Sequence, residues 1–184
     1  QQEPAGLGHA VWCARHLIND EPVAVLLADD LITGSSCMSE MVNAYKGGNM
    51  VAVMEVLKSD TGSYGIVTPG EDDGQIIDVS ALVEKPDPTD APSTIGVVGR
   101  YIIEPGVLTQ LANQGQGAGN EIQLTDALAR QIGKVPFKGL RFSGERFDCG
   151  SKIGFLQANI AFAMSRDDLA SQLHNWLANR FPNS

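Results

Sequence analysis

The 184 residues include 22 acidic and 13 basic side chains, and the net charge of −9 without a Lys/Arg cluster argues against nucleic acid or an anionic membrane as partner. No apolar run approaches the roughly 20 residues that a membrane-spanning helix needs. The three cysteines are widely spaced, which favours free thiols in a reducing, cytoplasmic setting. We expect residues 1–184 to form a single domain.

The first segment is a Pro/Gly-rich loop, and a helix is predicted over 8–18. The apolar run 22–28 follows and stops at two adjacent carboxylates, Asp29 and Asp30. A short unbroken apolar run predicts a strand buried on both faces in the middle of a parallel sheet. The two carboxylates would then lie at the carboxyl end of a central strand, where open α/β sheets bind their ligands.

Two interpretations of these carboxylates stay open at this point. Asp29 and Asp30 can hold a hard cation such as Mg²⁺, which takes oxygen ligands. Alternatively, they only turn the chain into a solvated loop.

Helices and strands alternate along the rest of the chain. A helix over 37–45 between two apolar runs gives a strand–helix–strand unit, which is typical of a mostly parallel sheet. Asp72-Asp73-Gly74 resembles a hairpin tip. The predicted strands cover 50–56, 64–67, 76–83, 95–103 and 135–142, a loop covers 144–150, and the predicted helices cover 105–113, 121–132, 151–164 and 167–181.

Glu84-Lys85-Pro86 is a second polar cluster at the end of an apolar strand. A residue before proline favours extended backbone, so Lys85 should point off the strand end. The carboxylate could accept from sugar hydroxyls while the ammonium neutralises a phosphate. A surface ion pair leading into a proline-rich turn explains the same residues.

Other candidates lie beside glycines. Asp148 precedes a predicted helix and could cap it or serve as a second metal ligand. Gly65 offers bare backbone that a ligand can approach, and the loop around Gly6 does the same at a helix start. No Ser/His/Asp or Cys/His set is evident. Carboxylates, one lysine and glycine-rich backbone suit phosphoryl-group transfer, where positioning and charge neutralisation supply most of the catalysis.

Together these segments resemble the bacterial UTP–glucose-1-phosphate uridylyltransferases (UDP-glucose pyrophosphorylases) of the sugar-nucleotidyltransferase family. Each motif is weak alone, but their order along almost the whole chain is specific. After Gln1 they are GLGHA (6–10), LADD (27–30), YGIV (64–67), VEKP (83–86), VVGRY (97–101), GAGNEIQLTD (117–126) and DCGSK (148–152). GLGHA and GAGNEIQLTD favour the uridylyl enzyme over its thymidylyl relatives.

The resemblance implies an α/β, Rossmann-like nucleotidyltransferase fold with a mixed, mostly parallel sheet flanked by helices. It implies conversion of UTP and glucose 1-phosphate to UDP-glucose and pyrophosphate with Mg²⁺, by a homo-oligomer, dimer or tetramer. By resemblance Asp29 and Asp148 hold the metal, and Lys85 meets the sugar phosphate. The remaining assignments by resemblance place Glu84, Gly65, Val97 and Glu121 around the sugar and Gln1 and Gly6 at the uracil edge.

The sequence departs from the family in one respect, because the glycine-rich loop that grips the triphosphate is not found. It would precede Gln1, so we expect an incomplete N-terminus, and a chain that is inactive alone. Two alternatives stay open: a thymidylyl- or adenylyltransferase of the same family, and a non-catalytic nucleotide-sugar-binding or assembly module.

Overall fold

The computed structural model describes residues 1–181, and residues 182–184 of the expected single domain lie outside the described part. The chain divides into two compact units. The first contains Gln1–Leu26 and Cys37–Ser143, and the second contains Leu27–Ser36 and the chain from Gly144 onward.

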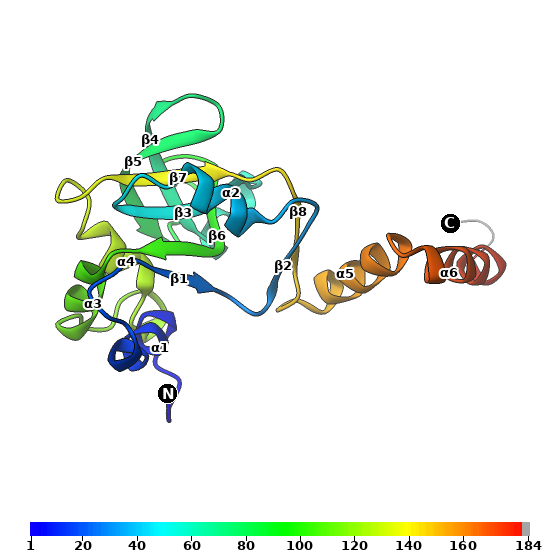
Figure 1. Ribbon diagram of the computed structural model, residues 1–184, viewed down its shortest axis with the longest axis horizontal. Helices are drawn as coiled ribbons and strands as arrows, with labels where there is room; N and C mark the ends of the chain where they lie inside the picture. The colour runs from blue at the N-terminus through cyan, green and yellow to red at the C-terminus, as the bar shows by residue number, and fades with distance from the viewer. Residues whose placement is uncertain (182–184) are drawn as a thin grey trace. The chain divides into compact units, whose positions relative to one another are not determined.

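Six strands of the first unit form one mixed sheet in the order β1-β6-β3-β7-β5-β4 (Figure 1). Its two most apolar strands, β3 and β6, lie next to each other and are almost entirely buried. The α/β class and the mixed sheet are therefore confirmed. The strands are β1 (Val23–Leu26), β3 (Asn49–Glu55), β4 (Gly65–Asp72), β5 (Ile76–Glu84), β6 (Ile95–Ile103) and β7 (Phe137–Arg141).

The prediction of a central position for the first apolar run is wrong. β1 lies at the edge of the described sheet, and alternate residues are exposed, including Leu26 at 53%. Apolar composition predicts a strand, but burial on both faces requires neighbours that the local sequence does not specify.

The expected majority of parallel pairings is also wrong. Among the described strands, β3 and β7 form the one parallel pair in this sheet. β6 runs antiparallel to both β1 and β3, so these two strands share a direction but do not pair with each other. The hairpin between β4 and β5, with its tip at 72–74, adds a further antiparallel pair, as predicted.

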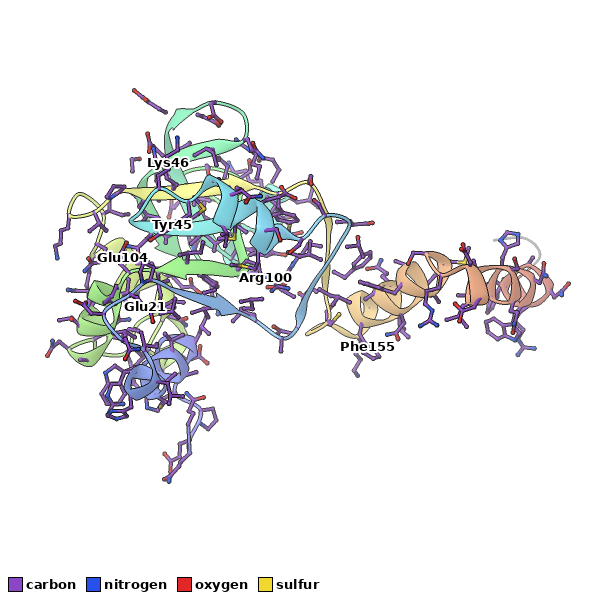
Figure 2. The ribbon with its side chains drawn as sticks, viewed as in Figure 1. Glu21, Tyr45, Lys46, Arg100, Glu104 and Phe155 are labelled. Atoms are coloured by element: carbon purple, nitrogen blue, oxygen red, sulfur yellow. The ribbon has the colours of Figure 1, made fainter. Side chains whose placement is uncertain are left out.

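Helices of the first unit pack in two places. α2 (Cys37–Ala44) contacts β3 and β6, and Tyr45 after its end donates a 2.9 Å hydrogen bond to Glu104 after β6 (Figure 2). The helices α1, α3 and α4 contact one another (Figure 1). α1 covers Leu7–Cys13, α3 covers Pro105–Ala112 and α4 covers Leu124–Ala129. The first unit also contains the 3₁₀ turns η1 (Arg15–Leu17), η2 (Lys58–Ser63) and η3 (Ala118–Asn120). α1 and α4 are shorter than predicted.

The second unit contains a small ladder that the sequence did not predict. β2 (Asp30–Thr33) and β8 (Glu145–Asp148) pair antiparallel, with Asp30 opposite Asp148. α5 (Lys152–Met164) follows β8 and contacts it and α6 (Asp167–Arg180), close to both predicted ranges. The Ser151 hydroxyl caps α5 by accepting from the Gly154 N–H, so Asp148 is not the cap of this helix. Within residues 1–181, no helix is both long and apolar enough to cross a membrane.

Candidate active site

The two residues predicted to read a base lie together at the N-terminus. The Gln1 side chain donates a 3.2 Å hydrogen bond to the Gly6 carbonyl and lies 2.9 Å from Nδ1 of His9. Gly6 has a φ of 100°, in the region that glycine tolerates best. A Cβ at Gly6 would lie 2.7 Å from the Ile122 carbonyl oxygen, so only glycine fits this approach.

That approach joins the N-terminal loop to the segment that carries Glu121. The Gly8 N–H donates to the Ile122 carbonyl, and the Ile122 N–H donates to the Ala5 carbonyl, each at 2.8 Å. A Cβ at Gly6 would also lie 2.8 Å from the Glu121 Cβ. The structure therefore brings together Gly6 and Glu121, which the resemblance assigned to different parts of the nucleotide sugar.

A second group of predicted residues gathers around Glu84 at the end of β5. A Cβ at Gly65 would lie 3.2 Å from both the Glu84 carboxylate and the Thr125 hydroxyl. The Thr125 hydroxyl lies beside that carboxylate and lowers its pKa, whereas Asp126 and Glu121 are close enough to raise it. We call Glu84, Glu121, Thr125 and Asp126 the acceptor cluster. Its oxygens suit recognition of sugar hydroxyls, which donate hydrogen bonds to carboxylates.

Burial controls the ionisation of Glu84. The side chain is 10% exposed, and desolvation raises its pKa above the ordinary 4.5. The nearby Thr125 hydroxyl and the positive charge of Lys85 lower the pKa of Glu84, but they do not fully offset desolvation.

Lys85 adopts a backbone that the sequence did not predict. Its φ is 47°, although a residue before proline favours extended geometry, so that expectation is wrong. The Lys85 N–H donates to the Tyr64 carbonyl at 2.9 Å, and this tertiary bond helps to hold the left-handed turn. The ammonium lies 3.8 Å from Glu84 and its side chain is 42% exposed, which leaves it accessible to a phosphate.

Val97 lies on β6 opposite Val53 and is 7% exposed. Its neighbour Gly96 pairs with Ile66, next to Gly65 along β4. The proposed contact of Val97 with the sugar stays a prediction.

The two predicted metal ligands lie in the second unit and approach each other. A Cβ at Gly150 would lie 3.0 Å from Oδ1 of Asp148 and 3.2 Å from Oδ2 of Asp29. The two carboxylates, which we call the aspartate pair, thus flank one point beside a residue without a side chain. A 2.7 Å hydrogen bond from the Cys149 N–H to the Asp29 carbonyl holds the two segments together.

Asp30 has a different environment from that of its neighbour Asp29. It is 5% exposed and forms an ion pair with Arg146, whose guanidinium also lies 4.0 Å from Asp148. Asp29 is exposed, and its carboxylate forms no hydrogen bond or ion pair with the rest of the described chain.

The donor set of the aspartate pair fits Mg²⁺. This ion usually binds one or two protein carboxylates and completes its octahedral shell with water and substrate phosphates. No cluster of three or more His, Cys, Asp or Glu side chains is arranged for a metal within residues 1–181. A magnesium site here would therefore rest on two carboxylates and on substrate oxygens.

Comparison with known proteins gives the same family from sequence and from structure. A family profile described as nucleotidyl transferase matches residues 1–163. The chain belongs to this nucleotidyl transferase family. This nucleotidyl transferase is 51% identical, over 94% of its length, to a UTP–glucose-1-phosphate uridylyltransferase of Komagataeibacter xylinus. It is 42% identical, over 96% of its length, to the UTP–glucose-1-phosphate uridylyltransferase YngB of Bacillus subtilis. It spans 60% and 61% of those two relatives.

Solved structures of nucleotidyl transferases share the fold. A UDP-glucose pyrophosphorylase complexed with UDP-glucose has a TM-score of 0.86 and 36% identity, with 90% of this chain and 65% of that chain covered. A UTP-bound enzyme from Acinetobacter baumannii has a TM-score of 0.84 and 33% identity, with 95% and 62% covered.

Two residues of the candidate site could not be picked out by residue type in the sequence of this nucleotidyl transferase. Thr125 lies beside Glu84, and the side-chain amide of Gln123 donates a 3.0 Å hydrogen bond to Glu121. Both lie in the GAGNEIQLTD segment, from which only Glu121 was selected. Their presence at the start of α4 was the available signal.

Proposed function

We propose that the natural protein that carries this sequence transfers a uridylyl group from UTP to glucose 1-phosphate and releases pyrophosphate, giving UDP-glucose. A phosphate oxygen of glucose 1-phosphate attacks the α-phosphorus in line, and the bond to the pyrophosphate oxygen breaks. The attacking phosphate oxygen of glucose 1-phosphate is already anionic at neutral pH, so the reaction needs no general base. Positioning and charge neutralisation therefore supply the catalysis.

Each candidate residue has a distinct role in this proposal. Lys85 neutralises the sugar phosphate, and its exposed ammonium suits that role. Around the sugar, Glu84 and Glu121 accept hydrogen bonds from hydroxyls, while the bare backbone of Gly65 and the side chain of Val97 complete the pocket. Gln1 and Gly6 contact the uracil edge.

Asp29 and Asp148 would hold Mg²⁺. When bound, the ion offsets the repulsion between two polyanionic substrates on an acidic protein. The open carboxylate of Asp29 supports this role, whereas Asp30 is already paired with Arg146.

One observation carries the proposal: the hydrogen bonds that join the Gly6 loop to the Glu121 segment. The loop assigned to the base and the residue assigned to the sugar are neighbours, so one nucleotide sugar can contact both. The named relatives and the UDP-glucose-bound structure support the choice of uridine and glucose.

Turnover of the natural protein with each of four nucleoside triphosphates and glucose 1-phosphate tests this proposal. We expect UTP to be preferred and activity to require Mg²⁺. Preference for another nucleotide would indicate a thymidylyl- or adenylyltransferase, and binding of UDP-glucose without turnover would indicate a non-catalytic module.

Further proposals concern the whole protein. We propose that both units belong to one catalytic domain, since the family profile extends from residue 1 to 163.

We also propose a homo-oligomer that associates through α5 and α6, because Phe155, Leu156 and Trp176 are more than half exposed there. Light scattering of wild type and Phe155→Glu tests this association; Phe155 is labelled in Figure 2.

We also propose that the protein works in the cytoplasm, because its three cysteines are free.

A further inference from the structure

Gln123 is a buried polar residue beside the acceptor cluster. It is 5% exposed and precedes α4 as its N-terminal flanking residue. Its side-chain amide donates to the Ala118 carbonyl at 2.9 Å and to the Glu121 carboxylate at 3.0 Å. Both hydrogens of the amide group therefore have acceptors, which fixes the orientation of the side chain.

The loop that Gln123 bridges has an unfavourable backbone. Gly119 and Asn120 are consecutive left-handed residues, with φ of 71° and 60°. Non-glycine residues rarely adopt this conformation, so surrounding contacts must hold the turn. The Gly117 N–H donates to the Glu121 carbonyl and the Asn120 N–H to the Gly117 carbonyl, and these bonds close the loop.

The backbone of Gln123 is itself anchored. Its carbonyl accepts a 2.8 Å hydrogen bond from the Gln114 side chain, which follows α3. The segment that follows α3 thus holds the backbone of Gln123, and the Gln123 side chain contacts Ala118 and Glu121 at the two ends of the loop. Glu121 is an exposed residue with several rotatable bonds, so without this bond its carboxylate would sample many positions.

We infer that Gln123 is a positioning residue for sugar recognition: it holds the Glu121 carboxylate and the left-handed loop 118–121 in the orientation that accepts a hydroxyl of the sugar phosphate. The inference rests on the proposed function for the role of Glu121. Gln123 acts through Glu121 and does not itself contact the substrate. Preorganisation of this kind improves affinity for the substrate that the held group contacts.

Steady-state kinetics of the natural protein with Gln123→Met tests the inference. Methionine keeps the length of the side chain but donates no hydrogen bond. We expect the KM for glucose 1-phosphate to rise about tenfold, as loss of a charge-assisted hydrogen bond predicts, while the KM for UTP changes less than about twofold. In a Glu121→Ala background, Gln123→Met should have almost no further effect on either value.

The matched control is Gln131→Met. Gln131 is equally buried, at 5% exposure, and its amide donates to the Gly106 carbonyl at 3.4 Å, outside the acceptor cluster. It should leave both KM values unchanged. Equal increases in both KM values for Gln123→Met, an undiminished effect in the Glu121→Ala background, or the same sugar-specific effect from Gln131→Met would overturn the positioning role.

Hydrogen exchange separates this inference from the proposed reaction. In Gln123→Met the amides of Gly117 and Asn120 should exchange at least about tenfold faster, since the loop that they close is released. The amides should be unaffected in Gln131→Met. If the unsubstituted protein fails to transfer uridylyl groups, the proposed reaction is wrong, and unchanged exchange in Gln123→Met would separately refute the hold on the loop.

Discussion

The acceptor cluster and the aspartate pair are both groups of carboxylates, but their environments differ. In the acceptor cluster, Glu84 is nearly buried beside Thr125, and Glu121 accepts a hydrogen bond from Gln123. In the aspartate pair, Asp29 is exposed, and the Asp148 carboxylate accepts a 3.0 Å hydrogen bond from the Gly150 N–H and lies 4.0 Å from the Arg146 guanidinium. A fixed, desolvated acceptor such as Glu84 favours neutral hydroxyl groups, whereas partly exposed carboxylates that face one point favour a hydrated cation.

The same difference separates the adjacent residues Asp29 and Asp30. Asp30 forms a buried ion pair with Arg146, and it lies opposite Asp148 in the β2–β8 ladder. Proximity in sequence therefore does not give two carboxylates one role. The partner supplied by a distant strand decides which of them remains available.

Of the substitutions that test the difference between the two carboxylate groups, Asp29→Asn should have the largest effect on turnover. The side chain is exposed, so the fold should persist, but loss of a metal ligand should reduce Mg²⁺-dependent turnover of the natural protein by at least about a hundredfold. Steady-state assays, with circular dichroism to check the fold, measure this. Near-normal turnover would exclude Asp29 as a ligand.

Arg146→Met should instead act mainly on stability. It leaves the Asp30 charge buried without its partner, and such a change costs about 3 kcal/mol of unfolding free energy. Urea unfolding measures the loss. Replacing both partners, as in Asp30→Leu with Arg146→Met, should recover much of it, and no recovery would mean that the pair is not the cause.

Lys85→Ala tests the cation beside the acceptor cluster. If the ammonium neutralises the sugar phosphate, the KM for glucose 1-phosphate should rise about tenfold or more, and the KM for UTP should change much less. Equal effects on both constants would indicate a structural ion pair with Glu84 instead.

Glu84→Gln should give a smaller effect that depends on pH. Desolvation raises the pKa of Glu84 in the folded protein, so the folded state binds the extra proton more tightly than the unfolded state does. The stability that this proton supplies is present below the ordinary value of 4.5 and is lost as pH rises through the raised pKa. The variant should therefore gain stability relative to wild type over that window. Urea unfolding at a series of pH values measures the difference, and a constant difference would contradict the desolvation argument.

Much of the fold could be predicted because its signals are local. A near-continuous apolar run predicted β3, a β-rich run predicted β6, and apolar residues at helical spacing predicted α6. The β2–β8 ladder could not be predicted, since its strands are four residues long and are defined by each other. The edge position of β1 depends in the same way on distant partners.

The candidate site shows the same division. Its carboxylates and lysine follow apolar runs, and that position drew attention to Asp29, Glu84 and Lys85. The left-handed backbone of Lys85 depends on a tertiary hydrogen bond to Tyr64. Thr125 and Gln123 contact the side chains of Glu84 and Glu121, and their place at the start of α4 was the only signal before these contacts were known.

Calorimetric titration of UDP-glucose into the natural protein, with and without Mg²⁺, tests the division between the two carboxylate groups most directly. In wild type, Mg²⁺ should increase the affinity. Asp29→Asn should abolish that increase and keep the affinity measured without metal, whereas Glu84→Ala should weaken binding under both conditions and keep the increase. An undiminished effect of Mg²⁺ in Asp29→Asn, or its loss in Glu84→Ala, would contradict the account.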